Sequence, residues 1–389
     1  RLRGMTMFIT PLYLGWECGA EGWCPEVKAQ GPATARDFGR WVGNRYRVQP
    51  NIIWVNGGDV DAWAYGVGEA TEALVEGVKE FDTVHLWTAH CNRESSARDC
   101  YDRPWLDFDN TYSNCSTSPA RIRDDYQRFP WMPTVYSEGI YEFEHDVTGQ
   151  CIRSQAWWAA LGGQIGHFYG SGKIWDFPAG WRDGLQTEGT GSIDLMGRIL
   201  RARGWGNLVP DYGHQAMIAG YGNIDDETWA AVATRGDRNS ILAYIPTPRT
   251  VTIAMDRVAG LASDVWWIDP ETGESQLAGR FTNSGTRDYT TPGPGDWVLI
   301  IDNADAQLTD PWIGATAVGD TPQASPVQIV SASPNPFNPR TVLSFSGPEG
   351  ARLRAEVFDT RGRLVDQIFD GVATGAVQSM VWEPRDLAS

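Results

Sequence analysis

Short apolar runs alternate with segments of helical spacing through residues 1–208, and this alternation restricts the fold more than any other feature of the sequence. It predicts βα units, in which a helix follows each strand of a parallel sheet. No expected strand is followed by a GxGxxG or GxxxxGK[ST] loop, so the phosphate-binding chemistry of a doubly wound nucleotide-binding fold is missing. We therefore predict a (β/α)₈-type barrel, with six strands within residues 7–16, 51–55, 83–87, 105–109, 133–138 and 165–170.

A barrel of this type closes with eight strands, and the sequence offers six strand runs. Either two strands have no clear sequence pattern or the first two βα units of the barrel are missing from the chain, and we expect the latter. An incomplete barrel would leave apolar strand edges exposed.

After residue 208 the pattern changes to β. Residues 209–303 contain strand-like runs separated by Gly, Pro, Asn and Asp turns, which predicts an antiparallel β-sandwich. Residues 304–326 are expected to be a linker, and residues 327–389 a small Ig-like β module that ends before its last strand. The predicted fold class is thus multidomain: an incomplete (β/α)₈ TIM-barrel-type domain, a β-sandwich and an Ig-like module.

The chain is strongly acidic, with 32 Lys and Arg residues against 49 Asp and Glu residues and a net charge of −17. A negative protein repels phosphate backbones, which argues against nucleic acid as a partner. There is no run of 18 or more apolar residues, so we predict no membrane-spanning segment. The 19 tryptophans favour a partner with apolar faces and hydroxyl groups, as sugars have, although a core position is the alternative for each of them.

The six cysteines all lie within the first 151 residues and have none of the spacings of a zinc site. Their even number indicates disulfides and an oxidising compartment. The short-range pairs Cys18–Cys24 and Cys91–Cys100 are plausible, but six cysteines allow 15 pairings.

The stretch NIIWVNGGD, residues 51–59, runs from an apolar strand through two glycines to a carboxylate. Because the carboxyl ends of parallel barrel strands form the active face, we predict a functional role for Asp59. Gly57 and Gly58 would let the backbone turn sharply beside it. The alternative is that Asp59 caps the next helix, a role for which Asp61 is better placed.

A second acidic cluster, PTVYSEGIYEFEH, has Glu138 at the end of a strand and Glu142 and Glu144 beyond it. If both strands belong to one barrel, Asp59 and Glu138 meet at the same mouth. Two facing carboxylates are the equipment of glycoside hydrolysis. A solvated surface position is the alternative for Glu142 and Glu144.

Competing catalytic motifs are missing from the sequence. There is no GxSxG, and none of the five histidines lies in HExxH. His85 and His167 fall within strand runs and are interpreted as structural residues or substrate contacts. Asp107 and Asp109 could hold a cation, but two carboxylates alone make a weak site. We predict no cofactor and no metal site.

Several ordered segments of the chain resemble the apiosidase-like glycoside hydrolases, a family of (β/α)₈ enzymes. They look like the family's third, fourth, sixth, seventh and eighth strand regions, and they cover most of residues 7–177: PLYLGW, FGRWVGNRYRVQPNIIWVNGGD, WLDFD, PTVYSEGIYE and SQAWWAALGGQIGHFYGSGKIWDF. The resemblance implies that Asp59 is the general acid/base and Glu138 the nucleophile of a retaining mechanism, supported by Glu142. The family's characterised activity removes apiose from pectic rhamnogalacturonan II, whereas the loop around Cys91–Cys100 is this chain's own and leaves the sugar open.

The later segments also have resemblances. Residues 209–303 are similar to the β-sandwich that often follows such barrels and carries the name of a collagen-binding domain. The segment SPNPFNPRT and the strands after it resemble the C-terminal sorting or anchoring modules of bacterial secreted proteins. This resemblance implies export and contact with the cell surface or the secretion machinery.

The sequence therefore predicts a secreted bacterial glycoside hydrolase, extracellular or on the cell surface, that acts with retention on plant or microbial polysaccharide. The alternative is a catalytically silent carbohydrate-binding or adhesive surface protein, and collagen adhesion through residues 209–303 is a third hypothesis. We expect burial beside Trp54 or Trp63 and the charge of Glu138 to raise the pKa of Asp59. The predicted sugar contacts are Trp16, Tyr141, Glu142, His167, Tyr169 and Trp175.

Overall fold

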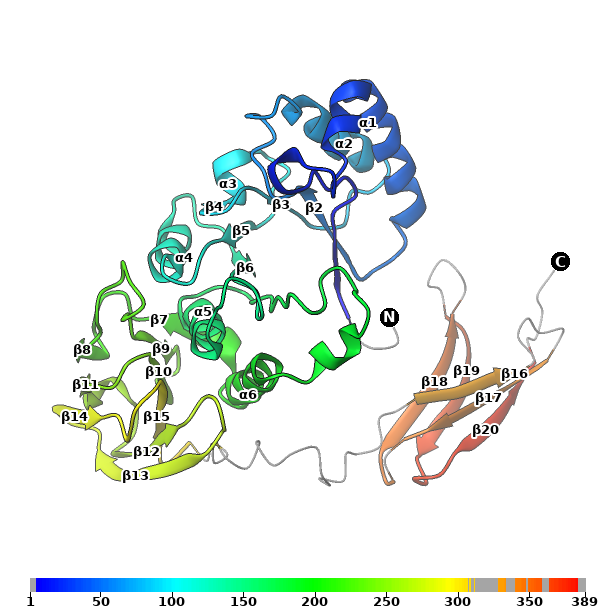
Figure 1. Cartoon of the computed structure of the whole chain (residues 1–389). Coiled ribbons are helices and arrows are strands. Elements are labelled where there is room, and N and C mark those ends of the chain that lie inside the picture. The colour runs from blue at the N-terminus through cyan, green and yellow to red at the C-terminus, as the bar shows by residue number, and fades with distance from the viewer. Residues whose placement is uncertain are drawn as a thin grey trace. The chain divides into compact units, whose positions relative to one another are not determined.

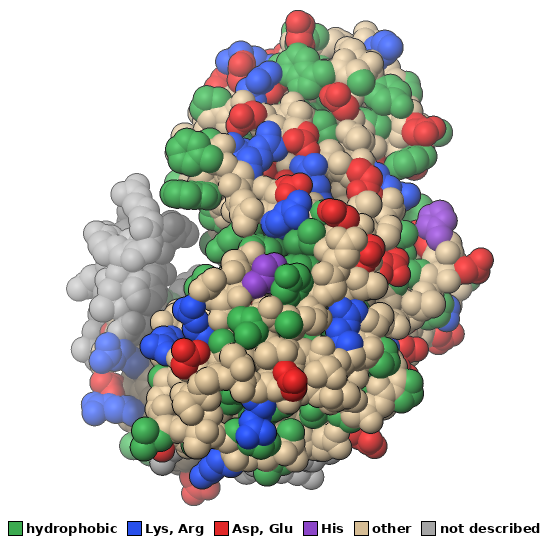
Figure 2. Space-filling model, turned by 90° about the vertical axis from the view of Figure 1, so that its left-hand side faces the viewer, with side chains coloured by type: hydrophobic (Ala, Val, Ile, Leu, Met, Phe, Trp, Pro, Cys, Tyr) green, Lys and Arg blue, Asp and Glu red, His purple; other side chains and the backbone are tan. Residues whose placement is uncertain are grey.

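The computed structural model describes residues 5–306, 308, 311, 328–333, 340–347, 349–358 and 364–383. The chain divides into two compact units, Arg1–Ala315 and Thr316–Ser389. Within the described ranges, no helix is both long enough and apolar enough to cross a bilayer. On the face that Figure 2 shows, acidic and basic side chains are interspersed, so this face has no continuous basic surface.

The first unit opens with parallel strands that have helices around their outside (Figure 1). β1 pairs with β2 and β2 with β3, in a register that sets Met7 opposite Ile52 and Trp54 opposite Trp87. β5 pairs in parallel with β6, and Tyr136 of β6 forms a parallel bridge with His167. The strands of this part are β1 (Met7–Ile9), β2 (Ile52–Gly57), β3 (Trp87–His90), β4 (Ser95–Ser96), β5 (Asp109–Tyr112) and β6 (Thr134–Glu138).

Helices connect these strands, as the alternating pattern predicted. They are α1 (Cys24–Tyr46), α2 (Gly68–Lys79), α3 (Ala97–Cys100), α4 (Ser118–Gln127), α5 (Gly149–Leu161) and α6 (Glu188–Ala202), with 3₁₀ turns at Trp16–Cys18, Trp181–Leu185 and Trp205–Asn207. α6 shows the sequence logic: Thr187 caps its first turn by accepting the N–H of Thr190 over 3.2 Å, and Leu195, Met196 and Ile199 are buried.

Four of the predicted strand runs need correction. The strands lie at Trp87–His90 and Asp109–Tyr112 instead of 83–87 and 105–109. Only residues 7–9 of the run 7–16 are a strand, and the run 165–170 contributes a single bridge at His167. The predictions for β3 and β5 were wrong because they followed apolar residues. Val84 and Leu86 are exposed and precede β3, whereas β3 and β5 end in the polar residues His90 and Tyr112.

Three phenylalanine rings meet between β1, the first strand of this part, and the segment that follows the bridge at His167, the last. The ring of Phe8 in β1 lies 4.7 Å from that of Phe168, which follows the bridge at His167, and 5.9 Å from that of Phe108. Both contacts are edge-to-face, a favoured geometry for aromatic pairs. These side chains therefore cover part of the apolar surface beside β1.

The remainder of the first unit is an antiparallel sandwich, as predicted. One sheet has the order β13-β12-β15-β10-β9-β7 and the other β14-β11-β8, with buried apolar side chains between them. The strands are β7 (Leu208–Pro210), β8 (Met217–Ala219), β9 (Ala231–Arg235), β10 (Ser240–Ile245), β11 (Thr250–Ala254), β12 (Ala262–Ile268), β13 (Ser275–Thr282), β14 (Thr286–Thr290) and β15 (Trp297–Asn303), with a 3₁₀ turn at Met255–Arg257.

The helical part and the sandwich share one core. Trp157 of α5 stacks on Tyr244 of β10 with ring centroids 6.0 Å apart, and Trp158 donates its indole N–H to the carbonyl of Trp229 over 2.9 Å. Arg153 of α5, 4 % exposed, makes two hydrogen bonds of 3.0 Å to Asp296 beside β15. The change in sequence pattern near residue 209 therefore falls inside one compact unit.

The second unit has two small antiparallel sheets, β16-β17-β20 and β18-β19. Its strands are β16 (Gln328–Ser333), β17 (Thr341–Ser346), β18 (Arg352–Phe358), β19 (Leu364–Val372) and β20 (Gln378–Trp382). This arrangement fits the predicted Ig-like module. The PNPFNP motif and most of the expected linker, residues 304–326, lie outside the described residues.

All six cysteines are paired, as Cys18–Cys24, Cys91–Cys100 and Cys115–Cys151. The two short-range pairings from the sequence are confirmed. The third joins the loop after β5 to α5.

Candidate active site

Three polar side chains come together at the carboxyl ends of parallel strands. His90 is the last residue of β3, Glu138 is the last residue of β6, and Asp59 follows β2 by two residues. A carboxylate oxygen of Asp59, a ring nitrogen of His90 and a carboxylate oxygen of Glu138 all lie within 4.8 Å of one another. The structure thus brings the two predicted catalytic carboxylates to one place and adds a histidine between them.

An unusual backbone turn places Asp59. Gly57, Gly58 and Asp59 have φ angles of 78°, 131° and 58°, a run of left-handed conformations that glycine tolerates best. A Cβ on Gly58 would collide with the ring of Tyr13, which packs directly on this backbone. The Tyr13 hydroxyl can therefore reach Asp59, and it donates to Oδ2 over 3.1 Å.

The surroundings of Asp59 favour its protonated form. Burial raises the pKa of Asp59, and the charge of Glu138 raises it further, against the opposing effects of His90 and of the Tyr13 and Tyr112 hydroxyls. Its Oδ1 is buried and has no hydrogen-bond partner among the described residues. A carboxyl group held in this way can keep a proton and offer it to a bound substrate.

His90 connects the two carboxylates. Its Nδ1 accepts the backbone N–H of Asp59 over 2.9 Å, and its Nε2 lies 2.7 Å from Oε2 of Glu138. Burial lowers the pKa of His90, but the contact with Glu138 and the charges of both carboxylates outweigh this effect and raise it. Nδ1 can accept the Asp59 N–H only while it is unprotonated, so the neutral ring carries its proton on Nε2, the atom that lies 2.7 Å from Glu138.

A hollow of about 700 Å³ surrounds the pair of carboxylates. Its lining includes three of the predicted sugar contacts, Trp16, Tyr141 and Trp175, and the indoles of Trp16 and Trp175 are 44 % and 58 % exposed. Burial and the neighbouring Glu138 carboxylate raise the pKa of Tyr141, which keeps its hydroxyl protonated. The full lining is Tyr13, Trp16, Glu21, Asp59, Arg93, Tyr112, Glu138, Tyr141, Glu144, His145 and Trp175.

The other three predicted contacts lie elsewhere. The Glu142 carboxylate is buried and accepts the hydroxyl of Thr187 over 2.6 Å, the N–H of Gly189 over 3.0 Å and the hydroxyl of Tyr169. Glu142 and Tyr169 therefore hold the amino end of α6. The ring of His167 stacks on Tyr136 with centroids 5.6 Å apart, and burial lowers its pKa to about 4, so it is neutral. None of these three residues lines the hollow around Asp59.

The sequence interpretation assigned no site role to Tyr13, Arg93 and Tyr112, which line this hollow. It also missed His90, which contacts both Asp59 and Glu138. His90 and Tyr112 each end a strand, so the rule that identified Asp59 would have found them had β3 and β5 been placed correctly. The Arg93 guanidinium lies 5.4 Å from the Trp16 ring and 5.7 Å from the Tyr112 ring. No sequence motif indicated Tyr13 or Arg93.

Several alternatives from the sequence can now be assigned. α2 begins after Val67, so neither Asp59 nor Asp61 is its N-cap, and Asp61 accepts the N–H of Trp63 instead. The indole N–H of Trp54 donates to Asp82 and that of Trp63 to the carbonyl of Cys100, whereas Tyr13, His90 and Tyr112 are the groups beside Asp59.

Asp107 and Asp109 have separate structural partners. Asp107 accepts the N–H of Trp87, and Asp109 accepts the N–H of Arg98. Burial raises the pKa of Asp109 to about 6. His85 lies between the carboxylate of Asp82 and the carbonyl of Gln49, 2.6 Å from each. Among the described residues, only Asp59, His90 and Glu138 are grouped closely enough to hold a metal ion.

Comparisons with known proteins agree with this geometry. Residues 1–207 match a family model described as "Apiosidase-like, catalytic domain", and residues 209–302 match one described as "Putative collagen-binding domain of a collagenase". The fold is similar to that of a glycoside hydrolase family 5 protein from Bacteroides vulgatus, with a TM-score of 0.66, 21% identity and coverage of 79% of this chain and 73% of that one.

A second solved structure, named glycoside hydrolase, has a TM-score of 0.64 and 21% identity over 74% of this chain and 72% of its own. No curated protein sequence matches the chain.

Proposed function

The chain belongs to the apiosidase-like catalytic-domain family and is a glycoside hydrolase that acts on carbohydrate, and from this premise we propose that it cleaves glycosidic bonds of plant or microbial polysaccharide with retention of configuration. Asp59 is the general acid/base in this proposal, and Glu138 is the nucleophile. The approach of one oxygen of each carboxylate to within 4.8 Å is the observation that carries it. Retaining enzymes hold their carboxyl groups about 5–5.5 Å apart, whereas inverting enzymes leave about 6.5–9.5 Å for a water molecule.

The two steps use the carboxylates in opposite protonation states. Glu138 attacks the anomeric carbon, while Asp59 donates its proton to the departing glycosidic oxygen, so that a glycosyl ester on Glu138 replaces the glycosidic bond. Asp59, now a carboxylate, then takes a proton from water, and the resulting hydroxide oxygen displaces Glu138. The raised pKa of Asp59 supports the first role, and the contact of His90 Nε2 with Oε2 over 2.7 Å supports a fixed position for Glu138.

The hollow supports binding of sugar rings. Trp16, Tyr141 and Trp175 offer aromatic faces against which the apolar faces of sugars pack, and Glu21 and Glu144 can accept hydroxyl hydrogen bonds. We propose Trp16, Tyr141 and Trp175 as substrate contacts, and structural roles for Glu142, His167 and Tyr169.

We also propose an extracellular or cell-surface location. Three disulfides in the first unit support an oxidising compartment, and the Ig-like second unit supports the anchoring role implied by its sequence resemblance. Contact with a secretion apparatus remains part of this proposal.

Matched variants test the catalytic assignment on aryl glycosides and pectic oligosaccharides. Glu138→Gln is expected to lower kcat/KM at least about a thousandfold on every substrate. Asp59→Asn is expected to lose about 10²–10⁴-fold on sugars with poor leaving groups and much less on dinitrophenyl glycosides, which leave without protonation. Glu142→Gln is the control, with kcat/KM within a few-fold of the parent chain.

The same assay separates hydrolysis from the binding alternative. A parent chain that binds polysaccharide but hydrolyses none of the substrates would favour a catalytically silent surface protein. Activity that survives in Glu138→Gln would exclude Glu138 as the nucleophile.

A further inference from the structure

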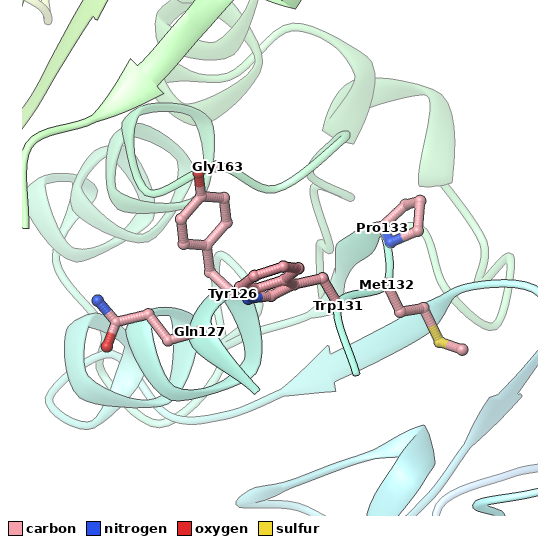
Figure 3. A pocket seen from close by; sticks show the side chains of 6 residues that line it. All are labelled: Tyr126, Gln127, Trp131, Met132, Pro133 and Gly163. Carbon is pink, nitrogen blue, oxygen red and sulfur yellow. The ribbon is translucent and has the colours of Figure 1, made fainter. Parts of the chain in front are cut away.

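We propose a second, non-catalytic site that binds neutral polysaccharide, in a hollow beside the amino end of β6; it rests on the proposed action on polysaccharide. This hollow measures about 690 Å³, close to the 700 Å³ of the hollow around Asp59. Figure 3 shows its lining, with Trp131 between the Tyr126 and Gln127 side chains of α4 and the Met132–Pro133 segment that leads into β6. Gly163 completes it.

The two hollows lie at opposite ends of the same strand. Pro133 immediately precedes β6, and Glu138 is its last residue. Five residues of extended strand span about 16 Å. A sugar chain in the Trp131 hollow therefore leaves the catalytic carboxylates free.

The rings in this region are presented to solvent. Phe129 and Trp131 are 77 % and 79 % exposed, the two highest values among the aromatic residues that the structure describes, and their rings meet edge-to-face at 5.7 Å. The indole N–H of Trp131 has no hydrogen-bond partner within the described part of the chain. Such rings offer flat apolar faces and one donor, which suits the CH faces and hydroxyl groups of a sugar.

Hydrogen bonds from two arginine side chains hold the backbone of the loop that carries these rings. Arg98, 4 % exposed, donates to the carbonyl of Pro130 over 3.0 Å, and Arg128 pairs with Asp99 of α3 over 2.7 Å. Both guanidinium groups thus have hydrogen-bond partners, and the Phe129 and Trp131 rings project from a backbone that these bonds hold in place. A rigid aromatic platform loses little conformational entropy when it binds.

The chemistry of the lining selects a neutral ligand. None of its six residues is charged, although the chain carries a net charge of −17 and the catalytic hollow contains Glu21, Asp59, Arg93, Glu138 and Glu144. The amide of Gln127 and the hydroxyl of Tyr126 add hydrogen-bonding groups for sugar hydroxyls. With no carboxylate in its lining, the hollow can hold a polysaccharide but cannot cleave it.

Affinity electrophoresis of the full chain tests this site, with soluble xyloglucan and galactomannan as neutral probes and polygalacturonate as the acidic one. The Glu138→Gln background removes turnover. We expect retardation by a neutral polymer, and a loss of about tenfold in affinity on adding Trp131→Ala. Trp41→Ala, at a 56 % exposed tryptophan of α1, is the matched control and should bind like its parent.

Kinetics separate this site from the catalytic hollow. In the chain with Glu138 intact, Trp131→Ala should keep kcat/KM on an aryl glycoside and lower it on the polymer. The proposal is overturned if no neutral polymer is retained, if Trp131→Ala binds as well as Trp41→Ala, or if polygalacturonate is the polymer that Trp131 retains. Self-association that Trp131→Ala abolishes would instead assign the hollow to a second copy of the chain. An inert parent chain that still binds through Trp131 would remove the hydrolysis proposal alone.

Discussion

The backbone N–H of Asp59 donates to Nδ1 of His90 over 2.9 Å, so the turn that presents one carboxylate also sets the tautomer of the ring that faces the other. Nε2 of that ring lies 2.7 Å from Glu138. The imidazole of His90, at the end of β3, thereby links the ends of β2 and β6.

His90 is therefore expected to act as a positioning residue for Glu138. His90→Phe keeps the ring volume but removes the N–H, and we expect kcat/KM to fall about 10–100-fold, equally for good and poor leaving groups. His90→Gln can present an amide N–H in its place and should recover part of the loss. Equal activity of His90→Phe and the parent chain would contradict this role, and a loss confined to poor leaving groups would assign His90 to Asp59 instead.

Tyr13 should affect the pH profile more than the maximal rate. Its hydroxyl donates to Oδ2 of Asp59, which stabilises the charged carboxylate and so lowers the pKa of Asp59. In Tyr13→Phe that pKa rises, and Asp59 keeps its catalytic proton up to a higher pH. We expect the basic limb of the kcat/KM profile to move up by about half to one pH unit, which corresponds to one hydrogen bond. A shift to lower pH would contradict the assignment of Asp59 as the acid, and Tyr289→Phe in the sandwich should leave the limb in place.

The junction between α5 and the sandwich is expected to limit stability. Asp296 accepts two hydrogen bonds from buried Arg153 and one of 2.8 Å from Tyr244. Asp296→Ala leaves the Arg153 charge without this partner in a buried place, so the free energy of unfolding should fall by about 3–5 kcal/mol in chemical denaturation. Asp264→Ala removes the partner of a 64 % exposed arginine, Arg280, and should cost at most about 1 kcal/mol. Equal losses in the free energy of unfolding for the two variants would contradict the greater contribution of the buried ion pair.

Chelation should leave the activity unchanged, whereas added Zn²⁺ should inhibit. His90 Nε2 already contacts the Glu138 carboxylate over 2.7 Å, and the mechanism uses that carboxylate as a nucleophile and needs no cation. Because Asp59, His90 and Glu138 offer three ligand atoms within 4.8 Å, Zn²⁺ can bind there and block Glu138. Initial rates with EDTA and with micromolar Zn²⁺ check this, and activity lost in EDTA and restored by a metal would contradict it.

The sequence predicted the architecture where periodicity was strong. The alternation of strands and helices, the change to β structure near residue 209 and the positions of β2 and β6 could all be predicted from residue patterns, although β2 runs two residues beyond the expected end at Val55. β3 and β5 could not, because the exposed apolar run 83–86 and the turn residues Trp105 and Leu106 resemble strand residues more closely than the segments that pair. Apolar character alone does not separate a strand from an apolar turn.

The candidate site shows the same division. Asp59 lies two residues beyond β2, and Glu138 is the last residue of β6, so the strand-end rule predicted that the two carboxylates would lie together. Glu142 belongs to the same acidic cluster as Glu138, but its side chain turns to the amino end of α6, where Thr187 and Gly189 satisfy it. Tyr13 reaches Asp59 across 46 residues only because Gly58 lets its ring lie on the backbone, a contact that no sequence spacing encodes.

The stereochemistry of the first product tests the central claim most directly. Time-resolved proton NMR of the cleaved sugar, recorded before mutarotation, shows whether the new anomer has the configuration of the bond that was broken. With one carboxylate oxygen of Asp59 within 4.8 Å of one of Glu138, the account predicts a retained anomer. An inverted first product would contradict it, because the attacking water would then need more room than this pair leaves.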